Sequence, residues 1–95
     1  CGTRALQATM TRGVWGIGVD SDLSYLGPTM LASVVKRFDR ATQLAVELFA
    51  SGQLPRGQDI QLDLSSGNIG LTAINSAAVP DAVKRKVDAL GSTLR

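Results

Sequence analysis

Histidine is absent from this chain of 95 residues, and cysteine occurs once. Without histidine the chain cannot assemble a Ser-His-Asp or Cys-His catalytic group. A single cysteine excludes both an internal disulfide and a zinc site of nitrogen and sulfur ligands. Aromatic residues make up 4% of the sequence, too few for a base-stacking surface, and the net charge of +2 does not come from a basic stripe. We therefore expect no metal, no cofactor and no nucleic-acid partner.

Long apolar runs are also missing, because no stretch approaches the roughly 18 residues that a membrane-spanning helix needs. What remains is ordinary globular composition, with 44% hydrophobic and 19% charged residues. This composition argues against a disordered chain and against a coiled coil. The length fits a single domain over residues 1–95.

The first part of the chain alternates between helix and strand patterns. Residues 3–12 contain good helix formers with apolar side chains four apart, and Gly13 is placed as a C-terminal cap. The apolar run Val14–Val19 predicts a short strand that is buried on both faces. It ends at Asp20, which opens a polar loop. This order of elements predicts an α/β fold.

The remainder reads as a long helix, a hairpin and a final helix. Pro28 is suited to the first turn of a helix, and apolar residues recur at steps of three and four from Leu31 to Phe49, which predicts one helix of about six turns that contains Lys36. Apolar and polar residues alternate over 60–64 and again over 69–74, which predicts a β-hairpin with a four-residue loop. The last helix is expected to begin at Asp81 and to end near Gly91.

Two carboxylates follow the predicted strand, at the place where open α/β sheets bind ligands. Asp20 and Asp22 can accept hydrogen bonds from vicinal sugar hydroxyls, as acidic residues at strand ends do in ribose-binding sites. An alternative is that Asp22 or Ser24 satisfies backbone amides of the loop or of a helix end. A second alternative is a small enzyme that uses the two aspartates as an acid–base or metal pair.

Two other features have a structural interpretation that is simpler than a functional one. Gly16 and Gly18 lie inside the predicted strand and lack the third glycine of a dinucleotide-binding loop, so we interpret them as points of close backbone packing. Residue chemistry alone makes Lys36 a solvated side chain with a snorkelling stem.

The run Gly13–Asp22 (GVWGIGVDSD), followed by Ser24–Pro28 (SYLGP), resembles the basic membrane protein (BMP) family. These proteins are substrate-binding lipoproteins of ABC transporters and include purine nucleoside receptors. Ser33–Arg37 (SVVKR) continues the similarity, which runs in one order through Leu71. The resemblance implies a partial lobe of a type I periplasmic-binding-protein fold, with three α/β/α layers. The chain then corresponds to the C-terminal segment of a BMP-like ligand-binding domain.

The resemblance also implies roles for individual residues. Asp20 matches the aspartate of the family's Gly-Val-Asp motif, which holds the ribose hydroxyls, and Lys36 matches a lysine that contacts the nucleoside from the same lobe. Asp22 is retained as a third candidate ligand residue. The sequence departs from the family at Leu23, where glutamine is usual, so polar support of that loop is in doubt.

Together these observations predict a non-catalytic solute-binding component of an ABC transporter that takes a nucleoside-like ligand between two lobes. The alternative is the ligand-sensing domain of a transcriptional regulator or receptor. The resemblance implies an ABC permease as partner and an extracytoplasmic location, with the full-length protein anchored to the membrane as a lipoprotein. Cys1 would suit lipidation, but the chain is helix-like from residue 3, so we interpret it as a fragment boundary. We expect the missing N-terminal lobe or a homo-oligomer to cover exposed edges, with Val14–Val19 inside the sheet.

Overall fold

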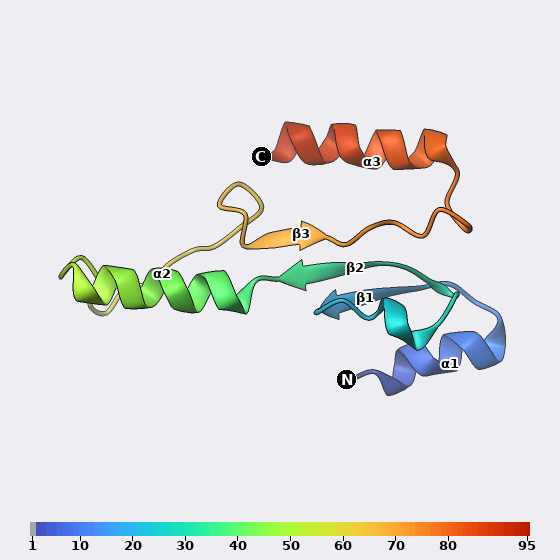
Figure 1. Cartoon of the computed structure of the whole chain (residues 1–95), viewed down its shortest axis with the longest axis horizontal. Coiled ribbons are helices and arrows are strands. Elements are labelled where there is room, and N and C mark those ends of the chain that lie inside the picture. The colour runs from blue at the N-terminus through green and yellow to red at the C-terminus, as the bar shows by residue number, and fades with distance from the viewer. Residues whose placement is uncertain (1) are drawn as a thin grey trace.

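The computed structural model describes residues 2–95, so Cys1 and its lipidation lie outside the described residues. Figure 1 shows a small α/β structure in which two helices lie on opposite sides of the strands and a third extends beyond them. The elements in chain order are α1 (Arg4–Arg12), β1 (Gly16–Asp20), a short 3-10 turn (Ser24–Leu26), β2 (Met30–Lys36), α2 (Phe38–Ala50), β3 (Ile69–Leu71) and α3 (Asp81–Leu94). The α/β class is confirmed.

The three strands form one sheet in the order β1-β2-β3. β1 and β2 are parallel, with Val19 opposite Val34 and Asp20 opposite Val35. β3 runs antiparallel to β2, and Ile69 lies opposite Lys36. The carboxyl ends of β1 and β2 therefore meet at the same edge of the sheet, on the side from which α2 extends (Figure 1).

The first and last helices agree with the sequence prediction. α1 ends where Gly13 adopts a left-handed conformation with a φ of 64°, and the Gly13 amide donates to the carbonyl of Thr9. Glycine reaches this conformation without steric cost, which explains the cap. α3 begins at Asp81 as expected, but it continues past Gly91 to Leu94.

The expected helix from Pro28 to Phe49 is wrong in its first half, because Met30–Lys36 is the central strand. A run of apolar residues that includes two adjacent valines suits a strand with neighbours on both sides as well as it suits a helix face. Periodicity does not separate the two cases. The helix begins only at Phe38, after the amide of Arg37 has donated to the carbonyl of Asn68 at 2.7 Å.

The expected hairpin is also wrong, because residues 60–64 form no strand and β3 pairs with β2 instead. The end of that segment folds into a turn in which the Asp63 carboxylate accepts from the Ser65 hydroxyl at 2.7 Å and from the Ser66 amide at 3.0 Å. Leu62 and Leu64 are half-buried. The alternation of apolar and polar residues thus reflects a turn in which the leucines are partly buried and the aspartate between them binds the backbone.

The buried apolar core of the described chain is small. It consists of Leu23, Leu26 and Met30, with Leu6 of α1 packed against it. β1 contributes its glycine face to this core, whereas Ile17 and Val19 on the other face are 55% and 51% exposed. The prediction that this strand is buried on both faces is therefore wrong for residues 2–95, in which that face has no cover.

Gly18 allows β1 to approach β2 and the loop after β1 very closely. A Cβ atom at Gly18 would lie 3.0 Å from the Leu23 Cβ and 3.1 Å from the Ser33 Cβ, and closer still to the Ser33 Oγ. Ser33 is 1% exposed, and its hydroxyl accepts from the Leu23 amide at 3.0 Å. The interpretation of this glycine as a point of close packing is confirmed.

We expect Gly18→Ala to lower the free energy of unfolding by roughly 1–3 kcal/mol, because overpacking displaces Ser33 and breaks its hydrogen bond to Leu23. Gly70→Ala in β3 is the matched control, since a Cβ there meets no heavy atom within 4 Å in the described chain. Urea unfolding followed by circular dichroism measures both variants. Equal losses for the two would contradict the packing role of Gly18.

Candidate functional site

Two of the three predicted ligand residues, Asp20 and Lys36, meet in the structure. Asp20 ends β1 and Lys36 ends β2, and the Lys36 Nζ lies 2.8 Å from the Asp20 Oδ1. The side chains of Lys36 and Asp20 are 50% and 58% exposed. The pair thus marks the carboxyl edge of the parallel strands with one charge of each sign, open to solvent.

The structure corrects the place of Lys36. The sequence pattern put this lysine on a helix, whereas it is the last residue of the central strand. Parallel pairing of β1 and β2 carries both strands to the same edge, which is why residues 16 positions apart in sequence become neighbours.

Asp20 has an unusual backbone conformation. Its φ is 79°, and it is the one non-glycine residue with a positive φ in the described part of the chain. This region costs an L-residue about 1–2 kcal/mol, although aspartate tolerates it better than most residues do. Such conformations concentrate at ligand clamps, where the surrounding structure holds them. At Asp20 the chain leaves β1 and turns into the loop that carries Asp22.

The Asp22 carboxylate is hydrogen-bonded within its own loop. Its Oδ1 accepts a hydrogen bond from the Ser24 amide at 2.9 Å, which starts the short 3-10 turn. This backbone hydrogen bond, helped by the Ser24 side chain, lowers the pKa of Asp22 below its usual value. The structure therefore gives Asp22 the turn-forming contact that the alternative interpretation expected.

Each residue of the ion pair lines a hollow of its own. Asp20 lines one of them, together with Gly2, Thr3, Leu6, Ile17, Val19, Ser21 and Leu23. Lys36 lines the other, together with Arg37, Phe38, Ala41, Leu62, Asn68 and Ile69. The two charged residues therefore border different, partly apolar depressions.

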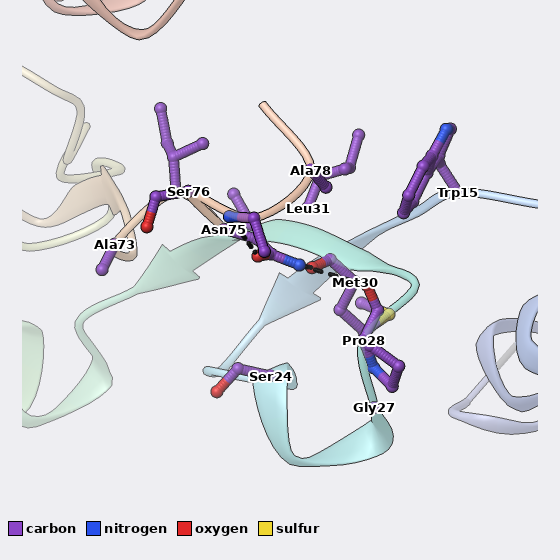
Figure 2. Close-up of a pocket in the computed structure, with 13 residues that line it drawn as sticks. Trp15, Ser24, Gly27, Pro28, Met30, Leu31, Ala73, Asn75, Ser76 and Ala78 are labelled. Carbon is purple, nitrogen blue, oxygen red and sulfur yellow. Dashed lines mark hydrogen bonds between the residues drawn. The ribbon is translucent and has the colours of Figure 1, made fainter. Parts of the chain in front are cut away.

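A larger hollow of about 700 Å³ lies at the opposite end, where β1 and β2 begin. Figure 2 shows Trp15 on one side of it and Ala73 and Ser76 on the other, with Asn75 between them. No charged residue is among the described residues that line it. It brings together none of the predicted site residues.

The importance of Asn75 is not visible in the sequence. Its Nδ2 donates to the carbonyls of Pro28 and Met30 at 3.1 and 3.2 Å, and its amide donates to the carbonyl of Leu31 at 2.7 Å (Figure 2). Asn75 thereby fastens the segment after β3 to the start of the central strand. An asparagine in a loop carries no pattern that would have predicted this contact over more than forty residues.

A second ion pair sits beside the first. Arg37 donates to both carboxylate oxygens of Asp39 at 3.0 and 2.7 Å, and this lowers the pKa of Asp39 to about 2. Arg40 donates to the carbonyl of Gly67 at 3.1 Å, which ties the start of α2 to the returning loop. These contacts hold the segment that follows Lys36.

Other kinds of site were also sought among residues 2–95. No group of three or more histidine, cysteine, aspartate or glutamate side chains there could hold a metal ion. Within the same residues, no helix has the length and apolar character needed to cross a membrane.

Comparison with known proteins gives one family and one structure of note. Residues 2–93 match the family described as ABC transporter substrate-binding protein, PnrA-like. The crystal structure of a transcriptional activator of the comK gene from Bacillus halodurans is similar, with a TM-score of 0.82 and 30% sequence identity. The similarity covers 93% of this chain but 31% of the activator, so the chain spans about a third of that protein's length. No curated protein matches the sequence.

The Asp22 contact predicts a pH-dependent turn. Because the folded-state pKa of Asp22 lies below the unfolded value, the carboxylate stabilises the turn above the unfolded pKa, and this stabilisation is lost as the pH falls through the lowered value. In NMR titrations we expect the Asp22 carboxyl to titrate below 3.8 and the Ser24 amide shift to follow it. In Asp22→Asn, which keeps the acceptor, the Ser24 amide should stop titrating. A Ser24 amide that is indifferent to Asp22 would contradict this contact.

Proposed function

This chain belongs to the family of PnrA-like ABC transporter substrate-binding proteins, and we propose that it supplies one wall of a binding site for a nucleoside-like solute. The observation that supports this proposal is the meeting of Asp20 and Lys36 at the carboxyl edge of the parallel strands, 2.8 Å apart. Ligands of open α/β sheets bind at this edge. Residues 1–95 are, in this proposal, one segment of a larger two-lobed domain.

The chemistry of the pair suits a sugar. A carboxylate accepts hydrogen bonds from two adjacent hydroxyl groups, and such charge-assisted bonds contribute about 1.5–3 kcal/mol each. Lys36 occupies Oδ1 of Asp20 in the described structure, which leaves Oδ2 free of ion-pair contacts among the described residues. Lys36 also provides donors for an acceptor atom of the ligand, such as an ether oxygen or a ring nitrogen of the base.

We propose Asp22 as a third ligand residue that contributes less to binding than Asp20 does. Its Oδ1 already accepts from the Ser24 amide, so a ligand would have to share or replace that bond. This engagement also argues against an enzyme in which Asp20 and Asp22 act as an acid–base pair, because one of the two carboxylates serves the backbone. The proposed role is binding without catalysis.

For the complete protein we propose an extracytoplasmic location, with anchoring to the cell membrane as a lipoprotein and delivery of the solute to an ABC permease. The family match supports this setting. The alternative role is a ligand-sensing domain of a transcriptional regulator, which is favoured by the name of the similar solved structure, a transcriptional activator. The coding region upstream of Cys1 distinguishes the two, because export needs a signal segment and regulation needs a DNA-binding domain.

We expect the chain alone to bind purine nucleosides weakly, with a dissociation constant in the millimolar range or above. Enclosed sites bury about 70–90% of a ligand's surface, whereas Asp20 and Lys36 are half-exposed. Isothermal titration calorimetry with adenosine, guanosine and inosine measures this. Micromolar affinity of the isolated monomer would contradict the one-wall interpretation.

Substitutions distinguish the proposed roles of the Asp20 and Asp22 carboxylates in ligand binding. Asp20→Asn should abolish the nucleoside-dependent NMR shifts near Asp20 and Lys36, because it removes the charge but keeps a residue type that tolerates a positive φ. Asp22→Asn should preserve most of the response. A 2′,3′-dideoxynucleoside, which lacks the vicinal hydroxyls, is the matched ligand control and should produce no shift at Asp20. Equal responses to the nucleoside and to its dideoxy analogue would contradict a ribose contact.

A further inference from the structure

Ser33 is a buried polar residue in the middle of the central strand. It is 1% exposed and lies opposite Gly18 of β1. Its amide donates to the Thr72 hydroxyl and its carbonyl accepts from the Thr72 amide, each at 2.9 Å. Its hydroxyl accepts from the Leu23 amide at 3.0 Å. Because this chain encloses Ser33 by itself, these contacts do not depend on further parts of a longer domain.

The loop after β1 folds straight back over the strand that it leaves. Leu23 comes five residues after Gly18, yet its Cβ lies 3.0 Å from the place that a Cβ at Gly18 would occupy. Five residues of extended chain span roughly 17 Å. The chain must therefore reverse its direction at Asp20, Ser21 and Asp22, the residues between the end of the apolar run and Leu23.

This reversal begins with the positive φ of Asp20, which is 79°. A residue other than glycine keeps such a conformation only when the surrounding structure holds it. On one side of the turn, strand pairing places Asp20 opposite Val35. On the other side, Leu23 is held by its amide, which donates to Ser33, and by its side chain, which is 8% exposed in the apolar core. The turn is thus fixed at both of its ends.

We propose that Ser33 is a positioning residue of the candidate ligand site. Its hydroxyl binds the Leu23 amide, and this contact holds Asp20 at a positive φ and sets the direction of the Asp20 Cα–Cβ bond. The importance of that direction for a ligand rests on the proposed function. Ser33 acts through the loop, because its own side chain is buried away from any solute.

The contact explains why a serine suits this position. Alanine would leave the Leu23 amide without its acceptor in a buried residue, and an unpaired buried donor is destabilising. Threonine would add a methyl group to a Cβ that lies 3.1 Å from the place of a Cβ at Gly18. The missing side chain of Gly18 therefore makes room for the hydroxyl of Ser33.

NMR measurements on the unsubstituted chain, without ligand, test the geometry. We expect slow hydrogen exchange at the Leu23 amide and backbone scalar couplings of Asp20 that report a positive φ. Free exchange at Leu23, or couplings of ordinary extended backbone at Asp20, would overturn the proposal.

Ser33→Ala tests the cause. Exchange at the Leu23 amide should become roughly tenfold faster or more, and the Asp20 couplings should move toward those of a negative φ. The nucleoside-dependent shifts at Asp20 should fall about fivefold or more, because only a fraction of the molecules then hold the carboxylate in its binding direction. Asp20 couplings that stay unchanged while the Leu23 amide loses its protection would overturn the proposal, since the turn would then hold itself.

Ser33→Cys keeps a weaker acceptor of similar size. Under reducing conditions its Asp20 couplings and Leu23 exchange should lie between those of the unsubstituted chain and those of Ser33→Ala. This variant keeps the test available where alanine prevents folding. Couplings in Ser33→Cys that depart further from a positive φ than those in Ser33→Ala would overturn the proposal.

Thr72→Val is the matched control. It removes a hydrogen bond of similar length from the same residue, the one between the Ser33 amide and the Thr72 hydroxyl, and leaves the Ser33 hydroxyl in place. It should lower the stability to urea but leave the Asp20 couplings and the nucleoside response unchanged. Equal effects of Thr72→Val and Ser33→Ala at Asp20 would overturn the role of the Leu23 contact.

The failure of this proposal and the failure of the proposed function are distinguishable. An unsubstituted chain without nucleoside-dependent shifts at Asp20 would contradict the proposed function. The Asp20 couplings are measured without ligand, so they decide the role of Ser33 in either case.

Discussion

The parallel pairing of β1 with β2 is the contact on which the rest of the structure depends. It requires a backbone approach so close that Gly18 cannot carry a side chain without meeting Leu23 and Ser33. Ser33 then uses its hydroxyl to hold the loop after β1, through the amide of Leu23. The same approach therefore sets the strand register, shapes the loop and aligns the two strand ends at which Asp20 and Lys36 meet.

Polar contacts extend this arrangement to the third strand. The Ser33 amide donates to the Thr72 hydroxyl, and the Thr72 amide donates back to the Ser33 carbonyl, each at 2.9 Å. Asn75 continues the connection by binding three carbonyls at and before the start of β2. The buried apolar core is small, so these hydrogen bonds add to its few apolar contacts in holding the sheet together. α2 has no buried residue and is held at its start by the contacts of Arg37 and Arg40.

The sequence predicted the α/β class, α1, α3 and the place of Asp20 at the end of the first strand, because these depend on short-range signals such as caps, periodicity and a carboxylate after an apolar run. It failed at Met30–Lys36, where the choice between helix and strand is made by neighbours distant in sequence. It failed again at residues 60–64, which were expected to pair with residues 69–74 in a hairpin. β3 pairs with β2 instead, a strand more than thirty residues away in sequence. Lys36 was chosen through family resemblance and placed on the wrong element. Its nearness to Asp20 follows from strand register, which no local pattern encodes.

The strain at Asp20 and the openness of its ion pair act together at the proposed site. A half-exposed ion pair contributes about 0–1 kcal/mol, whereas a hydrogen bond from a hydroxyl to a carboxylate contributes about 1.5–3 kcal/mol. Ligand hydroxyls can therefore compete for the Asp20 oxygens at little cost, while Lys36 remains close enough to neutralise the charge. The positive φ of Asp20 is set by the fold without a ligand, so the direction of its Cα–Cβ bond does not have to be ordered on binding. The arrangement thus combines a fixed backbone with an exchangeable partner, which suits the proposed binding and release of a solute.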